Sequence, residues 1–201
     1  MATVPQVPTL TPAARAILDA AGDLFYDRGI NAVGVDTVAA AAGTTKKTLY
    51  DQFGSKAALA VAYLSERDLN YRAWVELSVG QHSGTERILA VFDALDSWMG
   101  ANSLKGCPFV HAHSELLGSP EHPAHDVIRG HKVWAREMLA DLAREEGAES
   151  PDPLAVQLTS LLEGAAVLRS ISEIPDAVAA SRRAAALLIE DQIVGHRSTG
   201  A

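Results

Sequence analysis

The sequence predicts an all-α protein of about nine helices. Apolar residues recur at helical spacing along most of the 201 residues, and glycines and prolines interrupt them at short intervals. No stretch shows the alternation of apolar and polar residues, bounded by turn dipeptides, that indicates paired strands. Hydrophobic residues make up 48% of the chain and charged residues 21%, a composition that can bury a core and argues against disorder.

Start and stop signals place the helices along the chain. Thr11 can cap a helix that opens with Pro12, and Gly29 can end it. Ser55 can cap a long helix that follows the break at Gly54. Either Thr44 or Thr45 can cap the third helix. The expected helices cover residues 11–29, 35–42, 45–53, 55–78, 85–99, 107–117, 123–146, 153–172 and 176–194.

The charge is unevenly distributed. The net charge is −8, yet residues 1–60 carry five basic and five acidic side chains, whereas residues 61–201 carry twelve and twenty. An acidic body with a neutral N-terminal module permits contact with nucleic acid through that module, although it does not require it.

The chain carries no signal for export or membrane insertion. No apolar run approaches the roughly 18 residues of a membrane span, and residues 1–12 lack a signal-peptide pattern. The single cysteine, Cys107, excludes an internal disulfide and fits a reducing compartment. We therefore expect a cytoplasmic protein with no membrane partner.

Residues 35–53 have the pattern of a helix-turn-helix. A short helix, a turn at Gly43 and a second short helix follow one another, and Leu49 and Phe53 can anchor the second helix. Lysines and hydroxyls then gather at its exposed N-terminal end, where they could contact phosphates or base edges in a major groove. Alternatively, this is a surface helix with two solvated lysines.

A longer stretch, residues 14–59, favours the first interpretation. Its spacing of residues resembles the DNA-binding domain of TetR-family transcriptional regulators. The residues that carry this resemblance are Ala14-Arg15-Ala16-Ile17-Leu18-Asp19-Ala20-Ala21, Leu24-Phe25, Gly29, Val35-Asp36-Thr37-Val38-Ala39, Ala42-Gly43, Lys46-Lys47-Thr48-Leu49-Tyr50, Phe53-Gly54-Ser55-Lys56 and Leu59.

The resemblance implies two domains and a set of DNA contacts. Residues 11–58 would form the DNA-binding domain, and residues 59–201 a helical ligand-binding and dimerisation domain. The implied DNA-binding residues are Thr44, Thr45, Lys46, Lys47, Thr48, Tyr50, Gln52 and Lys56.

The sequence departs from the family pattern at four positions. Val33 and Gly34 stand where a hydroxyl is frequent, which removes an expected phosphate contact. Lys47 replaces a frequent glycine and adds reach into the groove, whereas the carboxylate of Asp51 would repel phosphate. The operator sequence therefore cannot be carried over.

The C-terminal part suggests an effector pocket. The element Gly106-Cys107-Pro108-Phe109-Val110 resembles a subgroup of these regulators and opens the sixth expected helix. Aromatic and methionine residues gather in the same region, either as pocket lining or as ordinary core. The candidate pocket residues are Trp74, Phe92, Trp98, Cys107, Phe109, His111, Trp134 and Met138.

Cys107, His111 and Glu115 fall at i, i+4 and i+8 and could share one helix face. Such a face could ligate a soft metal, but no fourth ligand is evident, so we expect no metal and no cofactor. Cys107 could also be a sensor of electrophiles or oxidants, or a buried small apolar residue.

The helix expected over residues 153–172 has two apolar faces. One carries Leu154, Leu158, Leu161, Leu162, Ala165 and Leu168. A surface helix needs only one such face, so the second predicts either burial inside the subunit or a homodimer seam with the final helix. The candidate interface residues are Val156, Ser160, Gly164, Val167, Ile171, Ala180 and Ala184.

These features together predict a sequence-specific DNA-binding regulator. It would act as a homodimeric repressor on a pseudo-palindromic, double-stranded operator, and an unknown small-molecule effector would release it. The alternative is a small helical enzyme that uses Cys107 and His111 with a thiol or a metal. We do not expect an enzyme, because phosphate-binding loops and paired catalytic acids are missing from the sequence.

Overall fold

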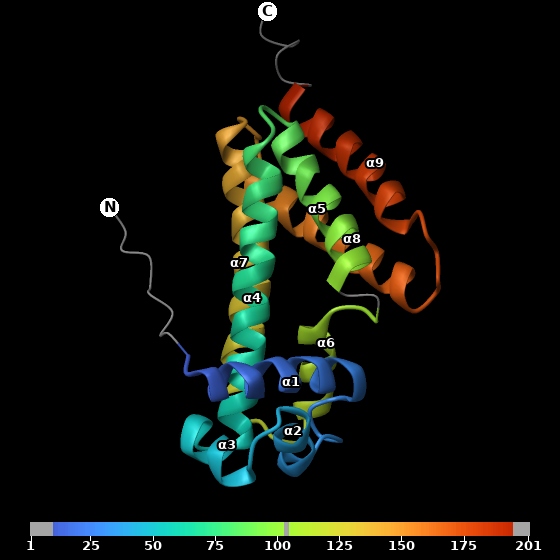
Figure 1. The fold of residues 1–201 in the computed structure, drawn as a ribbon. Helices are drawn as coiled ribbons and strands as arrows, with labels where there is room; N and C mark the ends of the chain where they lie inside the picture. The colour runs from blue at the N-terminus through green and yellow to red at the C-terminus, as the bar shows by residue number, and fades with distance from the viewer. Residues whose placement is uncertain (1–9, 103–104, 195–201) are drawn as a thin grey trace, which may run out of the picture. The chain divides into compact units, whose positions relative to one another are not determined.

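The computed structural model describes residues 10–102 and 105–194, and in these ranges it confirms an all-helical chain (Figure 1). The first four helices are α1 (Pro12–Arg28), α2 (Val35–Ala41), α3 (Lys46–Phe53) and α4 (Lys56–Gly80). They are followed by α5 (Glu86–Asn102), α6 (Pro108–Leu116), α7 (Ala124–Glu145), α8 (Pro151–Ser170) and α9 (Ala177–Ile189).

Several helix boundaries differ from the sequence prediction by two residues or more. α4 ends at Gly80 rather than at residue 78, and α5 ends at Asn102 rather than at residue 99. α8 begins at Pro151 rather than at Pro153, because prolines are tolerated in the first turn, where backbone N–H groups have no helical partner. The last α-helix ends at Ile189, and Glu190–Val194 continue as a wider π-helical turn.

The chain divides into two compact units, each described by itself. Unit 1 contains the described residues up to Ser65 together with His111–Val127, and unit 2 contains Glu66–Val110 and the described residues from Ile128 onward. The functional boundary expected at residue 58 stays a prediction.

Unit 1 is built on a three-helix head in which α1, α2 and α3 pack against one another. The Thr11 side chain accepts a hydrogen bond from the backbone N–H of Ala14 (3.1 Å), which confirms the expected cap of α1. Gly29 ends α1 with a φ of 90°, a conformation that favours glycine. The largest fully buried side chains of the head and of the start of α4 are Ile17, Val38, Leu49, Leu59 and Leu64.

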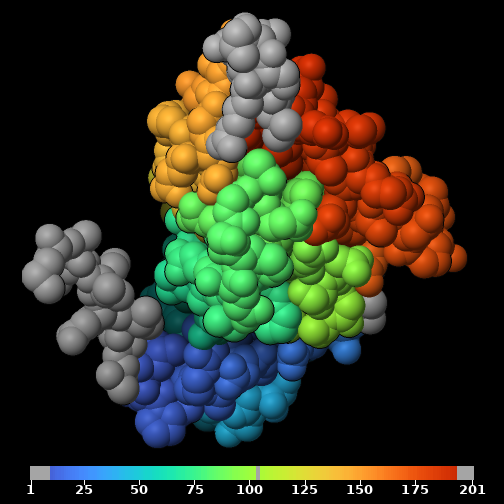
Figure 2. All heavy atoms as spheres, turned by 90° about the horizontal axis from the view of Figure 1, so that it is seen from above, coloured from blue at the N-terminus to red at the C-terminus, as the bar shows by residue number. Residues whose placement is uncertain are grey.

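Unit 2 has its own hydrophobic core. The core joins α4, α5, α7, α8 and α9, with Phe92, Leu139 and Leu158 among its fully buried side chains. Figures 1 and 2 show α8 and α9 adjacent to each other, in orange and red. Arg182 attaches α9 to α5, since its guanidinium pairs with Glu86 (2.8 Å) and Asp93 (3.0 Å).

α8 buries one face and leaves the other exposed. Leu154, Leu158 and Ala165 are buried as predicted, but the side chain of Leu168 is 42% exposed. Ala155 completes the buried stripe instead, so the stripe is rotated toward Ala155 and Leu168 falls at its edge.

The opposite face of α8, here called the outer stripe, consists of Val156, Ser160, Gly164 and Val167 with Ile171 just beyond the helix. All five residues are exposed within the described chain, and Ile171 is 74% exposed.

Candidate DNA interface and ligand cavity

The N-terminal end of α3 is fixed by its own residues. The Thr45 hydroxyl accepts a hydrogen bond from the backbone N–H of Thr48 (3.1 Å) and lies 2.9 Å from the Thr48 hydroxyl. This cap satisfies one of the free amides at the helix start. Leu49 is the only fully buried residue of α3 and Phe53 is half-buried, which leaves Lys46, Lys47 and Tyr50 exposed for contact with a partner.

Two exposed lysines stand at the start of α3, each beside a carboxylate. Lys46 pairs with Asp36 of α2 at 3.1 Å, and Lys47 pairs with Asp51 one turn later at 2.7 Å. The Lys47 side chain is 84% exposed. Ion pairs this exposed stabilise a protein little, so phosphate can displace either carboxylate at small cost.

The other predicted DNA contacts lie in the same head. Tyr50 is exposed, whereas Thr44 is half-buried and donates a long hydrogen bond (3.5 Å) to the backbone oxygen of Ala39. The Gln52 side-chain oxygen accepts a hydrogen bond from the Thr11 hydroxyl (2.7 Å).

The remaining predicted contact, Lys56, is half-buried at the start of α4, and its ammonium donates to the backbone oxygen of Asn31 (3.4 Å). The N-cap of α2 is Gly34, which makes no side-chain cap bond. This agrees with the absence of a hydroxyl from the sequence at that point.

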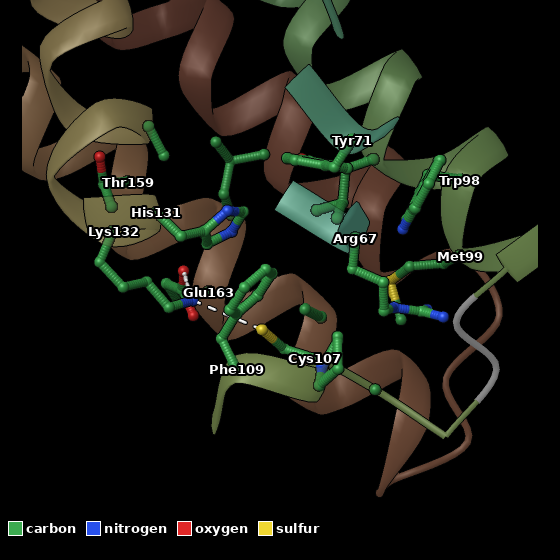
Figure 3. Close-up of a pocket in the computed structure, with 16 residues that line it drawn as sticks. Arg67, Tyr71, Trp98, Met99, Cys107, Phe109, His131, Lys132, Thr159 and Glu163 are labelled. Atoms are coloured by element: carbon green, nitrogen blue, oxygen red, sulfur yellow. Dashed lines mark hydrogen bonds and ion pairs between the residues drawn. The ribbon is translucent and has the colours of Figure 1, made fainter. Parts of the chain in front are cut away.

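Unit 2 contains a largely apolar cavity, shown in Figure 3. The space between its lining residues, open solvent included, is about 690 Å³. Its walls come from α4, α5, the start of α6, α7 and α8. The apolar lining residues are Leu95, Trp98, Met99, Gly106, Pro108, Phe109, Ala135, Leu162 and Ala166, and the polar ones are Arg67, Tyr71, Cys107, His131, Lys132, Thr159 and Glu163.

Lys132, Glu163 and Cys107 form what is here called the polar corner of this cavity, and Lys132 joins the other two. Its ammonium donates to the Glu163 carboxylate (2.5 Å) and to the Cys107 sulfur (3.6 Å), as the dashed lines in Figure 3 show. Burial alone would lower the pKa of Lys132, but the charges of Cys107 and Glu163 outweigh it and raise the pKa. Lys132 therefore stays a cation, and its charge is balanced by Glu163.

Tyr71 and His131 contribute polar groups from α4 and α7. Burial, with the nearby charges of Cys107 and Glu163, raises the pKa of Tyr71, so its hydroxyl stays protonated. Burial lowers the pKa of His131, although Nδ1 lies 2.8 Å from the Asp68 carboxylate. The His131 ring stacks on Phe109 with 3.8 Å between ring centroids.

α6 begins with the cavity residues Pro108 and Phe109, directly after Cys107, and its last turn contacts the α1–α2 turn of unit 1. Within unit 1, the Glu115 carboxylate accepts a hydrogen bond from the backbone N–H of Asn31 (2.7 Å). The Asn31 side chain donates in return to the backbone oxygen of Glu115 (2.7 Å), and His111 stacks on Tyr26 of α1. Glu115 thus holds the turn between α1 and α2.

The predicted pocket residues separate into two groups. Trp98, Cys107 and Phe109 line the cavity. The other five lie elsewhere: Phe92 is fully buried in the core of unit 2, Trp134 and Met138 pack against that core, Trp74 donates from its indole to the Ser97 hydroxyl, and His111 belongs to unit 1.

Cys107, His111 and Glu115 have three different partners, namely Lys132, Tyr26 and Asn31. Within residues 10–102 and 105–194, no group of three histidine, cysteine or acidic residues could hold a metal ion. Across the same ranges, no helix combines the length and the apolar character that crossing a membrane would need.

Comparison with known proteins identifies the family. Residues 17–63 match the model for bacterial regulatory proteins of the TetR family. A protein of Streptomyces avermitilis classed as a TetR transcriptional regulator is 31% identical, over 88% of this chain and 98% of that one, with a TM-score of 0.71. This chain belongs to the TetR family. No curated protein matches it.

Other solved structures share the fold of this TetR-family chain. A TetR-family transcriptional regulator of Streptomyces coelicolor is 26% identical over 90% of both chains, with a TM-score of 0.83. A TetR transcriptional regulator of Chloroflexus aurantiacus is 24% identical over 90% of this chain and 96% of the other, with a TM-score of 0.77, and supports the fold alone.

Sequence reasoning missed the polar cavity residues of this TetR-family chain other than Cys107. Glu163 offered a signal, because it is the only charged residue between Asp152 and Arg169 in an otherwise apolar helix. A lone carboxylate in such a helix indicates a buried partner. Tyr71 and Lys132 gave no comparable signal, since each lies among other polar residues.

The Lys47–Asp51 pair generates a prediction for this TetR-family head. Asp51→Asn removes a charge that repels phosphate and releases Lys47. We therefore expect affinity for DNA from the region beside its own gene to rise about two- to fivefold at low salt, and less at high salt. Fluorescence anisotropy at two salt concentrations measures the change.

Asp141→Asn is the matched control, because Asp141 forms a similar exposed pair with Arg144 in unit 2. It should leave the affinity unchanged. If Asp51→Asn weakens DNA binding while its melting temperature stays native, Asp51 contributes to the interface rather than opposing it.

Proposed function

We propose that this protein is a homodimeric repressor that binds a pseudo-palindromic operator through α3 and releases it when a small molecule occupies the cavity of unit 2. The observation that carries the proposal is the exposed start of α3. There Lys46, Lys47 and Tyr50 surround a capped helix end while Leu49 alone is buried. We propose the cytoplasm as its location.

The chemistry of α3 suits DNA. Lysines reach phosphates or guanine edges, and hydroxyls reach either phosphates or bases. The helix N-terminus itself favours a phosphate, because its amides point outward. The remainder of the chain is acidic, which limits non-specific attraction to DNA and leaves recognition to the head.

A homodimer is supported by the apolar surface of α8 and α9. The outer stripe leaves Val167 48% exposed, and on α9 Leu187 is 69% exposed. On α9, Ala180 is exposed and Ala184 half-buried, and small residues allow two helices to approach closely. A second copy would cover this surface and place two recognition helices about one DNA turn, roughly 34–36 Å, apart or at a multiple of it.

The cavity supports an effector. It is concave, mostly apolar and supplied with a few polar groups, as small-molecule sites usually are. α6 supplies lining residues at its start and holds Asn31 through Glu115 at its end. A ligand that prefers one position of α6 would therefore shift the population of DNA-competent heads in proportion to its differential affinity.

The enzyme alternative gains no support from the geometry. Cys107 bonds to Lys132 rather than to a histidine, and His111 stacks on Tyr26. A nucleophile needs a base within hydrogen-bond reach, and the described partners of Cys107 do not include His111. We propose a regulator without catalytic activity.

Removing both lysines of α3 tests the proposed DNA contact. Lys46→Ala/Lys47→Ala should weaken binding to DNA from the region beside its own gene by about tenfold or more. The slope of the logarithm of the binding constant against the logarithm of salt concentration should become shallower by about one for each lysine that contacts a phosphate. Folding should be preserved, because both side chains are exposed and their pairs stabilise little. Anisotropy across a salt series gives both quantities.

Lys105→Ala/Arg129→Ala serves as its control, since it removes two exposed cations from unit 2. A double lysine variant that melts normally and binds DNA with the wild-type dissociation constant would contradict the role of α3.

A charge in the outer stripe of α8 tests the proposed dimer interface. Val167→Glu places a charge in the outer stripe of α8, where pairing of two copies would bury it at a cost of several kcal/mol. Light scattering should show monomers, and operator affinity should fall because one head alone makes half the contacts.

Leu77→Glu is the control, as Leu77 is equally apolar and 65% exposed but belongs to α4. A monomeric wild type, or a Val167→Glu variant that stays dimeric and binds DNA normally, would refute the proposed interface.

A further inference from the structure

We propose that the cavity of unit 2 binds a neutral, planar, apolar molecule through one carbonyl oxygen, which accepts hydrogen bonds from Tyr71 and Lys132. This rests on the proposed function, because it names the chemical class of the effector.

The walls favour a flat apolar body. Trp98, Phe109, Leu95, Met99 and Leu162 are the large apolar side chains of the lining, and Figure 3 shows the first two on different sides of the cavity. Aromatic rings contribute large contact areas and favour stacked or edge-on partners. A planar ring system gains burial here without needing polar groups along its length.

Two donors remain for an acceptor on the ligand. The Lys132 ammonium has three N–H groups, and its contacts in the described chain, Glu163 and Cys107, use two of them. The Tyr71 hydroxyl makes no hydrogen bond within the described residues, and its proton is retained at neutral pH. Tyr71 and Lys132 both line this cavity, and the two residues whose charges raise the pKa of Tyr71, Cys107 and Glu163, are the hydrogen-bond partners of Lys132.

Three other polar residues of the lining each have a hydrogen-bond partner in the described chain. The Thr159 hydroxyl donates to the backbone oxygen of Ala155 (2.7 Å), and His131 Nδ1 is bonded to Asp68. The Arg67 guanidinium donates to the backbone oxygen of Asn102 (2.6 Å), and Figure 3 places it across the cavity from Lys132. An oxygen near Lys132 and Tyr71 is therefore the acceptor that the corner lacks.

At the Lys132 corner the charge of Glu163 favours a carbonyl over a carboxylate, and Arg67, the other cation of the lining, lies across the cavity from Lys132. Glu163 already neutralises Lys132, so a second anion at this corner would be repelled by the Glu163 carboxylate. A carbonyl accepts the same two hydrogen bonds without that repulsion. A hydrocarbon would instead displace water from both donors and leave them unsatisfied.

Three probes of one shape test this inference. Purified full-length protein without DNA is dialysed to equilibrium against 2-acetylnaphthalene, naphthalene or 2-naphthoate. We expect the ketone to bind about tenfold more tightly than naphthalene, as one to two hydrogen bonds predict, and more tightly than the carboxylate. A ketone is used rather than an aldehyde, because an aldehyde would condense with lysine amines.

Two variants assign the donors and the charge. Tyr71→Phe should weaken binding of the ketone several-fold and leave the affinity for naphthalene unchanged. The variant should fold, because the hydroxyl that it removes makes no hydrogen bond in the described chain. Glu163→Gln should reverse the preference, so that 2-naphthoate binds more tightly than the ketone, because the charge of Lys132 is then uncompensated. Glu76→Gln, at an exposed position of α4 outside the cavity lining, is the control and should change none of the three affinities.

The inference is overturned if naphthalene binds wild type as tightly as the ketone, or if 2-naphthoate binds wild type most tightly. It is also overturned if a natively folded Glu163→Gln keeps the wild-type order; if that variant fails to fold, the Tyr71→Phe result decides.

Operator affinity, measured separately by anisotropy, distinguishes the two proposals. If the ketone binds more tightly than naphthalene and 2-naphthoate but does not weaken DNA binding, effector release is contradicted and the proposed ligand class still holds. Release by other compounds, with no preference for the ketone, contradicts the ligand class alone.

Discussion

The DNA-binding head depends on the burial of Leu49. α3 has eight residues, too few for a stable helix in isolation, and Leu49 is its only buried residue. Truncating a fully buried leucine costs about 2–5 kcal/mol, a large part of the stability of a small three-helix unit. Leu49, together with the half-buried Phe53, packs α3 against the head, and the exposed side chains of α3 are left for recognition. The cap at Thr45 fixes where the helix starts, and the exposed pairs of Lys46 and Lys47 can be exchanged for phosphate at little cost.

The cavity follows a different physical logic from the head. A partly buried ion pair such as Lys132–Glu163 is expensive to desolvate, and it is retained in folded proteins where further hydrogen bonds complete it. Cys107 supplies one such bond, and an acceptor on a ligand would supply another. The first residues of α6 line the cavity, and Glu115 in its last turn holds the α1–α2 turn. One helix of nine residues therefore contributes both to the proposed ligand site and to the DNA-binding head. In this account the polar corner determines which ligands bind, and a change in the position of α6 on ligand binding alters the population of heads that can bind DNA.

The head was predictable from the sequence because its signals are local. Thr11, Gly29 and Thr45 cap or end helices through bonds that span three or four residues. The cavity was less predictable, since its residues come from five helices that only the tertiary fold brings together. Phe92 and Phe109 look alike in sequence, yet one is in the core and the other lines the cavity, because helical spacing reports burial and not what fills the space. Leu168 was placed on the buried face for the same reason, and a small rotation of that face left it exposed.

Selection of DNA from a random pool by the purified full-length protein tests the central claim most directly. The account predicts enrichment of a single motif with twofold symmetry, whose half-sites are centred about one helical turn apart or at a multiple of it, because two copies of α3 read it. It also predicts that Lys46→Ala/Lys47→Ala, in the same selection, loses the enrichment while remaining folded. Recovery of no motif by the wild-type protein, or of the same symmetric motif by the double variant, would contradict the account.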